Sequence, residues 1–350
     1  MDMIVLPGLI DVHTHLRVPG GEHKEDFASG TAAALAGGVT QLLAMPNTSP
    51  PLVDAVTYQS VKDQAIKEVR CDVGLFAGAS PEHAEQLPLL GQLAPALKIY
   101  LNDTFGPLRV EDVPTLRACF QDWPHEKMIA MHAEKQSVAV GLGLSAAYDR
   151  AVHFCHISRR EEIELISDAK TKGVKVTCEV SPHHLFLTQG DAAHLGPLGD
   201  MRPILGSRDD VDALWEHIGD TIDCIATDHA PHTLAEKKGP NPPPGVPGLE
   251  TSLSLMLTAV AQDRLSLDRV RELMHENPRR IYRLPAQPDT WIEVDMQPYV
   301  IGNEQLFTKV GWSPFAGMEV VGRVQRVYLR GELAYDRDKY MGRRGLGSVL

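Results

Sequence analysis

Three features that would place a protein in a special class are missing from this sequence of 350 residues. No apolar run reaches the length of about eighteen residues that a transmembrane helix needs, so no membrane span is predicted. Positive charge is not in excess, and the formal net charge of −12 argues against nucleic-acid binding. The N-terminus has no basic leader and no small-residue cleavage site, so no secretory signal is predicted.

Cysteine is also scarce. The five cysteines are odd in number and widely spaced, namely Cys71, Cys119, Cys155, Cys178 and Cys224. Most of them lie inside apolar runs, which is typical of reduced thiols and not of a disulfide framework. The sequence therefore predicts a cytoplasmic protein.

Apolar runs alternate with amphipathic, helix-like segments through the first two thirds of the chain. We count eight runs, at residues 3–13, 38–47, 71–78, 96–102, 128–134, 151–158, 174–184 and 221–232. Near-continuous apolar runs indicate buried parallel strands, and eight strand–helix units predict an α/β fold of the (β/α)8 TIM-barrel class. A doubly wound open sheet is the alternative, but no glycine-rich phosphate turn follows the first run.

The pattern changes after residue 233. A Pro/Gly-rich loop over 236–250 precedes two predicted helices near 249–263 and 267–282. Residues 289–301 and 320–336 then alternate apolar and polar side chains, which indicates antiparallel strands. We therefore predict a barrel over 4–285, a small, partial β subdomain over 286–340 and a loose tail over 341–350.

Polar residues gather where the apolar runs end. In a TIM barrel these ends meet at one face, which carries the active site. The residues concerned are His13, His15, Arg17, Asn47, Lys98, Asn102, His132, Glu134, Cys155, His156, Glu179, His183, His184, Asp228, His229 and His232.

A metal site is the first prediction from this set. His13 and His15 are two residues apart on a strand and so share a face. Zinc accepts neutral imidazole and carboxylate ligands, and we expect His13, His15, His132, His156 and Asp228 to supply them. For any single histidine, a hydrogen-bonded role in the core is the alternative.

Lys98 and Asp228 are the residues from which we expect chemistry. Lys98 lies within the buried run "ALKIYLN", where an unpaired ammonium is costly. It reaches solvent with its charged end, or is ion-paired, or is neutral and able to add carbon dioxide, giving a carbamate that could bridge two metals. Asp228 is expected to bind metal and accept a proton from water; a helix N-cap is the alternative.

Arg17, Asn47 and Arg202 are predicted to bind an anionic small molecule. Guanidinium groups bind carboxylates with two parallel hydrogen bonds, and two arginines near a metal site favour a carboxylate-bearing substrate. Taken singly, each arginine is more typical of a charged surface.

With these residues assembled, the chain resembles the amidohydrolase superfamily and, within it, the dihydroorotases, in particular the dihydroorotase domain of the animal trifunctional pyrimidine-biosynthesis protein. The resemblance spans residues 4–335 and depends on the motifs "PGLIDVHTHLR", "GEHKEDFASGT", "AMPNT", "LKIYLN", "HAE", "HFCHIS", "VTCEVSPHHLFL", "DHAPHT", "PPPGVPGLET" and "NPRRI". The paired histidines alone mark only the superfamily.

The resemblance implies a site with two zinc ions. One would be held by His13, His15 and Asp228, the other by His132 and His156, with N6-carboxylysine at Lys98 and a hydroxide between them. A third zinc near His13, Cys155 and Glu179 is also implied, although strict alternation would put Cys155 and His156 on opposite faces of a strand.

The resemblance further implies substrate contacts from Arg17, Asn47, Arg202, His232 and the backbone near Pro244. Thr104 and Phe105 would form a flexible loop over the site. The implied reaction is the reversible, water-releasing cyclisation of N-carbamoyl-L-aspartate to dihydroorotate, in which Asp228 moves the proton. The implied partners are flanking carbamoyl-phosphate synthetase and aspartate transcarbamoylase modules and a second copy of the domain in a homodimer.

One residue departs from the family pattern: Val18 stands where the family usually has glutamate after "HLR".

Two other functions remain open. A hydantoinase or allantoinase would share the fold and metals but not need the arginines. A non-catalytic scaffold on this fold would typically have lost metal ligands. Adenosine-deaminase-like chemistry, with one metal, is disfavoured because it would not need Lys98.

Overall fold

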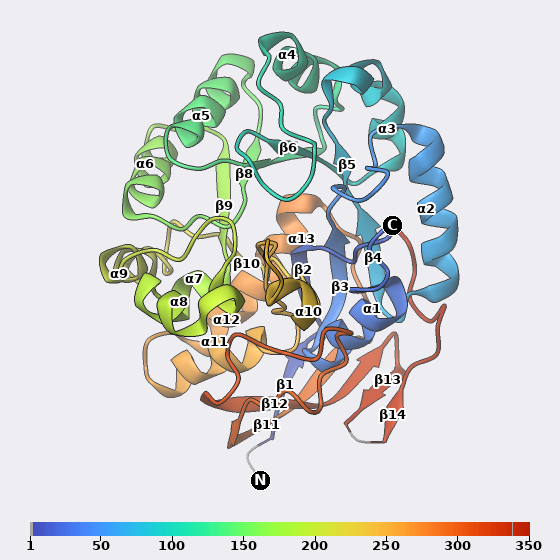
Figure 1. Ribbon diagram of the computed structural model, residues 1–350, viewed down its shortest axis with the longest axis vertical. Helices are drawn as coiled ribbons and strands as arrows, with labels where there is room; N and C mark the ends of the chain where they lie inside the picture. Colours follow the sequence, from blue (N-terminus) through green and yellow to red (C-terminus); the bar gives the residue numbers. More distant parts are fainter. Residues whose placement is uncertain (1–2, 338) are drawn as a thin grey trace.

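The computed structural model describes residues 3–337 and 339–350, and parallel strands form the centre of the molecule (Figure 1). In chain order the barrel strands are β2 (Leu9–Thr14), β3 (Val39–Ala44), β4 (Asp72–Leu75) continued by β5 (Ala77–Gly78), β6 (Ala96–Tyr100), β7 (Met128–His132), β8 (Val152–Phe154), β9 (Val176–Val180) and β10 (Cys224–Ile225). They pair in the orders β2-β3-β4 and β5-β6-β7-β8-β9-β10. A parallel bridge between Thr14 and His229 joins the first strand to the chain beyond the last. This closure confirms the TIM barrel.

Helices surround the barrel on the outside (Figure 1). They are α1 (Phe27–Ala36), α2 (Ala55–Glu68), η1 (Pro81–Gln86) with α3 (Leu87–Leu93), α4 (Val113–Asp122), α5 (Gln136–Tyr148), α6 (Arg160–Thr171), α9 (Arg208–Glu216), α11 (Ser252–Ala261), and α12 (Leu267–Arg271) with η3 (Glu272–Glu276) and α13 (Asn277–Tyr282). Shorter elements lie in the loops: α7 (Pro182–Phe186), α8 (Gln189–Leu195), η2 (Gly196–Gly199) and α10 (Leu234–Lys237). No helix within the described residues has the length and apolarity to cross a bilayer.

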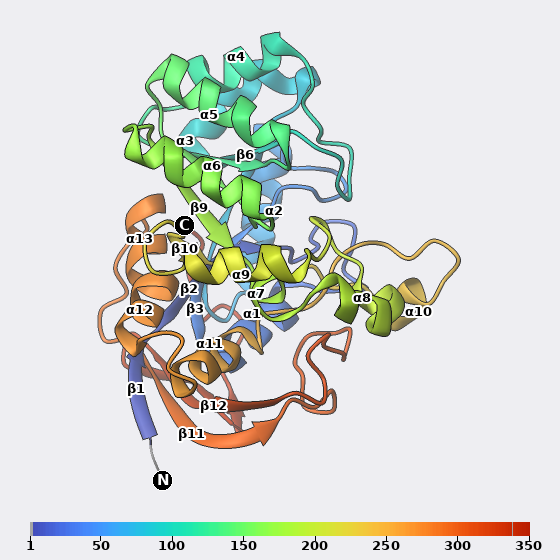
Figure 2. The ribbon, with the colours of Figure 1, turned by 90° about the vertical axis from the view of Figure 1, so that its left-hand side faces the viewer.

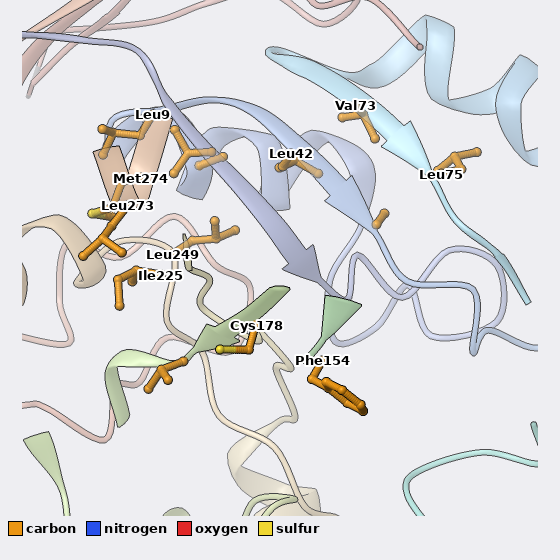
Figure 3. Close-up of a cluster of buried hydrophobic side chains, with 14 of the residues drawn as sticks. Leu9, Leu42, Val73, Leu75, Phe154, Cys178, Ile225, Leu249, Leu273 and Met274 are labelled. Atoms are coloured by element: carbon orange, nitrogen blue, oxygen red, sulfur yellow. The ribbon is translucent and has the colours of Figure 1, made fainter. Parts of the chain in front are cut away.

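The core has two layers because side chains of a strand alternate between its faces. In β6, Leu97 and Ile99 belong to the large apolar cluster between strands and helices, whereas Ala96 belongs to the cluster inside the barrel. Figure 3 shows the outer cluster, with Leu9 and Leu42 on neighbouring strands. Each fully buried leucine contributes about 1.5–3 kcal/mol. Lys98 shares the inward face of Ala96, so the fold directs its side chain into the barrel.

The first apolar run, expected as one strand, serves two sheets. It divides at Gly8 into β1 (Met3–Pro7) and β2, and β1 pairs antiparallel with β11 (Trp291–Val300) outside the barrel. A side chain at Gly8 would come within 2.3 Å of Thr40 Oγ1, so the chain passes closely over β3 at this point.

The remaining strands form an antiparallel sheet below the barrel (Figure 2). After β11 come β12 (Glu319–Leu329), β13 (Glu332–Asp336) and β14 (Tyr340–Met341), in the order β1-β11-β12-β13-β14. A small β subdomain formed mainly by the C-terminal segment is therefore confirmed, while the division at 285 and 340 stays a prediction. The end of the chain is not the loose tail that we expected: Val73 N donates to Ser348 O and Leu350 N donates to Val73 O, both at 2.9 Å.

Candidate active site

The strand ends bring the predicted metal ligands into one buried cluster. His13 comes from β2, Lys98 from β6, His132 from β7, Glu179 from β9, and Asp228 from the segment after β10. All five are at most 7 % exposed. The pairing of β2 with β3 shifts register between Asp11 and Thr14, so the histidine pair sits on a distorted strand end and not on the regular strand that we expected.

Asp228 lies between two imidazoles. Its Oδ1 is 3.3 Å from His13 Nε2 and 3.1 Å from His15 Nε2. The backbone holds it there, since His15 N donates to the carbonyl of His229 at 2.7 Å. Burial opposes ionisation of Asp228, but the neighbouring imidazoles of His13 and His15 outweigh it and hold its pKa well below the usual value. Asp228 caps no helix, because Thr233 caps α10.

The hydrogen bonds of the two imidazoles leave Asp228 facing lone pairs. His15 Nδ1 is 2.8 Å from Asn47 Oδ1, and the Asn47 amide is oriented by its Nδ2, which donates to Phe105 O. His13 Nδ1 is 2.5 Å from Glu179 Oε1. A neutral imidazole has one proton, so each ring donates it to these partners and turns an unprotonated Nε2 toward the carboxylate. Acceptors that face acceptors fit a cation between them.

A second pair of imidazoles, His132 and His156, also brings ring nitrogens close together. His132 Nδ1 and His156 Nε2 are 2.9 Å apart, and His132 Nε2 is 3.2 Å from Glu134 Oε1. Nδ1 of His156 is buried and has no hydrogen-bond partner. With its proton given to Glu134, His132 offers a lone pair that converges with His156. These observations fit the second metal position.

Cys155 and His156 both face the barrel mouth because β8 ends before them. The strand stops at Phe154, and His156 has φ +36°, in the left-handed region. Cys155 therefore stays on the inward face while His156 turns toward His132. His13, Cys155 and Glu179 bring three ligand atoms within 4.8 Å of one another, as His13, His15 and Asp228 also do. Burial raises the pKa of the Cys155 thiol.

Lys98 is completely buried beside this cluster. Its Nζ donates to Cys155 Sγ at 2.8 Å and lies 5.1 Å from the centre of the Tyr100 ring. Among the described residues no carboxylate forms an ion pair with it, so the ion-paired alternative is not supported. A buried amine without a counter-ion is the donor that carbamate formation requires.

All the predicted substrate and loop residues except His232 line one pocket next to Asp228. It is formed by Arg17, Asn47, Thr104, Phe105, Arg202 and Pro244, together with His15, Asp228, Ala230 and Gly245. His232 is not one of the lining residues, but its Nε2 is 3.0 Å from Arg17 Nη2. Burial lowers the pKa of Arg17 to about 10, so its guanidinium is charged at neutral pH. Val18 packs in the apolar core at 4 % exposure.

Sequence reasoning missed four polar residues that support the site. His153 Nε2 is 3.1 Å from Glu179 Oε2, and Asp11 accepts hydrogen bonds from Thr227 and His13. Burial raises the pKa of Asp11 to about 7. Lys24 contacts His232 from a loop. A period-two count back from Cys155 would have placed His153 inward; no sequence signal marked Lys24.

Comparisons with known proteins identify the family. Residues 4–112 match the model of the amidohydrolase family. The chain is 53 % identical to "Multifunctional protein CAD" of Squalus acanthias over 95 % of its own length but 15 % of that protein. It is 33 % identical to "Dihydroorotase" of Pyrococcus furiosus, covering 97 % of this chain and 83 % of that one. The chain therefore belongs to the dihydroorotase family of amidohydrolases.

Solved structures show the same fold. "L-Hydantoinase (Dihydropyrimidinase) from Arthrobacter aurescens" superposes with a TM-score of 0.94 at 24 % identity, over 99 % of this chain and 88 % of that one. "Inactive dihydroorotase-like domain of Chaetomium thermophilum CAD-like multifunctional protein" gives 0.85 at 29 % identity, over 100 % of both chains. Because the second structure is that of an inactive domain, the fold alone does not establish catalysis, and the residues of the site must be considered.

Proposed function

We propose that this chain is a zinc-dependent dihydroorotase, which interconverts dihydroorotate plus water and N-carbamoyl-L-aspartate in pyrimidine biosynthesis. The observation that carries the proposal is that Arg17, Asn47 and Arg202 line the same pocket as His15 and Asp228. A carboxylate held by the arginines would present the ring amide to the buried carboxylate and imidazoles.

The donor set fits two zinc ions. His13, His15 and Asp228 would hold one, His132 and His156 the other, and a carbamate on Lys98 would bridge them; Cys155 and Glu179 would hold a third with His13. The chemistry that bound zinc supplies is Lewis acidity, which polarises a carbonyl and makes water more acidic. All other steps belong to the protein's own side chains.

Asp228 would transfer the proton. In ring opening, the oxygen of water bonds to the amide carbon, the carbon–nitrogen bond breaks, and Asp228 receives a proton from that water and passes it to the leaving nitrogen. Cyclisation is the reverse. Arg17 and Arg202 orient the carboxylate, and Phe105 on the flexible loop excludes water.

The test is the Asp228→Asn variant. Loss of a proton-transfer group typically costs about a hundredfold to ten-thousandfold in turnover, and the fold should be unchanged because asparagine has nearly the same shape as aspartate. Turnover of dihydroorotate, measured with melting temperature and zinc content, decides the role. Near-normal turnover in a folded variant would reject it.

The second candidate is a non-catalytic homologue, which the inactive structural relative favours. Against it stand the two groups of three potential metal ligands, which share His13, and the arginine-lined pocket. Purified wild-type protein with well under one zinc per chain and no turnover of dihydroorotate would support the scaffold. Turnover of hydantoin in preference to dihydroorotate would instead support the hydantoinase alternative, which does not need the arginines.

Partners and location follow from the multifunctional relatives, of which the chain spans about 15 %. We infer flanking carbamoyl-phosphate synthetase and aspartate transcarbamoylase modules, a cytoplasmic location and a homodimer of this domain. Mass determination in solution across a concentration series tests the dimer; a monomer at every concentration would contradict it.

A further inference from the structure

His229, the residue that follows Asp228, is held by both its backbone and its side chain. Its carbonyl accepts from His15 N at 2.7 Å, and its own N–H donates to Thr227 Oγ1 at 3.1 Å. The side chain is buried, and its Nδ1 accepts from the backbone N–H of Gly248 at 3.1 Å. His229 therefore ties the segment after β10 to the end of β2 and to the loop before α11.

The backbone donor fixes the tautomer of this imidazole. A backbone N–H can only donate, so the Nδ1 that accepts from Gly248 carries no proton, and the ring is neutral with its one proton on Nε2. Nε2 is 3.3 Å from Glu25 Oε2. The contact is therefore a hydrogen bond that His229 donates to a completely buried carboxylate.

Glu25 is in turn oriented by the C-terminal part of the chain. It comes from the loop before α1, and its Oε2 also accepts from Thr308 Oγ1, which lies in the segment that joins β11 to β12. The backbone N–H of Thr308 donates to Glu250 Oε1 at 3.0 Å, so this segment is itself fixed against the loop before α11. A chain of hydrogen bonds thus runs from the segment between β11 and β12 to the residue beside Asp228.

Asp228 has a backbone conformation that its surroundings must hold. Its φ of +47° lies in the left-handed region, which is uncommon for residues other than glycine. Such conformations persist where neighbouring contacts fix the backbone. On one side, Thr227 donates through Oγ1 to Asp11 Oδ2 at 2.6 Å; on the other, His229 donates to Glu25. Two buried carboxylates therefore anchor the two neighbours of Asp228.

We propose that Glu25 is a positioning residue, which acts through His229 to hold Asp228 in the conformation that aims its carboxylate at the imidazoles. The proposal rests on the proposed function for the step that Asp228 performs. It also gives the C-terminal segment a part in the site, because Thr308 orients Glu25. Since Glu25 does not line the substrate pocket, it should act on metal affinity and kcat and not on substrate binding.

The first measurement follows hydrogen exchange of the His15 amide in the metal-free protein labelled with 15N-histidine. The signal is identified by its loss in His15→Gln. This amide donates to the carbonyl of His229, so its protection reports whether that residue is in place. In Glu25→Leu, Nε2–H of His229 loses its acceptor, and the amide should exchange about 10- to 100-fold faster, which corresponds to one hydrogen bond to a charged group.

The second measurement uses the enzyme with zinc. Glu25→Leu should lower zinc affinity and kcat by about 10- to 100-fold, the range for a residue that orients a metal ligand, and leave KM for dihydroorotate nearly unchanged. Glu25→Gln keeps an oxygen that can accept from His229 and should recover most of both losses. In His229→Asn, the side-chain oxygen can still accept from Gly248 N–H but no longer reaches Glu25, so adding Glu25→Leu should cause little further loss.

Asp72→Asn is the matched control. Asp72 is a buried carboxylate at the start of β4 that pairs with Arg330 at 2.8 Å, so this variant should lower the melting temperature without changing His15 exchange or kcat. Unchanged His15 exchange and zinc affinity in folded Glu25→Leu would overturn the proposal, as would additive losses in the double variant.

If Glu25→Leu does not fold, His229→Asn breaks the same link from the other side, and unchanged His15 exchange in that variant would overturn the proposal. Absence of dihydroorotate turnover in the wild type would refute the proposed function, yet the exchange of the His15 amide would still decide whether Glu25 holds His229 in place.

Discussion

The barrel mouth contains two adjacent regions with opposite hydrogen-bonding conflicts. Around Asp228, a carboxylate faces the unprotonated nitrogens of His13 and His15, so acceptors meet acceptors. Around His232, a ring proton faces Arg17 or Lys24, so donors meet donors. Buried polar groups without partners cost about 1–3 kcal/mol each, and the first conflict is relieved by a cation, the second by an anion. Their adjacency is what a metal-assisted reaction on an anionic substrate requires.

The largest effect on zinc affinity and turnover is expected from Lys98→Met, because this variant cannot form the carbamate whose negative charge would neutralise the cations of the first region. Zinc affinity and turnover should fall by more than about a hundredfold, the upper end for residues that merely orient a metal ligand. Zinc content after dialysis is the measurement. Lys237→Met is the matched control, because Lys237 is equally buried but donates to the carbonyls of Asp200, Pro243 and Gly245. Zinc retained in Lys98→Met would contradict the bridging role.

Arg17→Met removes a cation from the second region, around His232, and leaves the ligands of the first region in place. We expect KM for dihydroorotate to rise about 10- to 100-fold, because a charged hydrogen bond is lost, with zinc content unchanged. A neutral cyclic amide such as hydantoin, which has no carboxylate, serves as the control substrate, and any turnover of it should be unaffected. An equal loss for both substrates would mean that Arg17 supports the site without recognising the carboxylate.

Asn47→Leu tests whether the two regions are coupled. Asn47 accepts from His15 in the first region and donates to Phe105 O in the second. We expect about a tenfold loss in zinc affinity, typical of a residue that orients a metal ligand, together with a higher KM. Titration with zinc measures the zinc affinity, and steady-state kinetics measure KM. A change in only one of these two quantities would show that the regions are independent.

The smallest effect is expected at Glu250, whose carboxylate oxygens accept hydrogen bonds from N–H donors and which affects stability, not turnover. Its carboxylate accepts from the backbone N–H groups of Phe307 and Thr308. Burial nevertheless raises its pKa from 4.5 to about 8. The folded state thus binds this proton more tightly than the unfolded state, and the stability of the protein falls as pH rises from about 4.5 to about 8.

Glu250→Gln removes this pH dependence. The melting temperature of the variant should improve relative to the wild type by a few degrees as pH is raised from about 5 to about 9. Thermal unfolding at several pH values measures it. A difference in melting temperature between wild type and variant that stays constant with pH would show that Glu250 ionises equally easily in the folded and the unfolded state.

Much of the site was predictable from period-two patterning. Lys98, Cys155, Glu179 and Asp228 each fall on the inward parity of their run, so a barrel brings them together. His156 was harder, because its place depends on a strand that ends at Phe154 and on a left-handed backbone. The division at Gly8 escaped sequence analysis, since an apolar run does not reveal that it pairs with two sheets.

The sequence by itself determined the repeating strand–helix units and the polar residues at their ends, because side-chain periodicity is a local property of the backbone. The tertiary structure alone decided which nitrogen of each histidine faces which partner. His15 and Asp228 are 213 residues apart, and Arg17 and His232 are 215 apart. Donor and acceptor roles at such contacts depend on geometry that exists only once the barrel has closed.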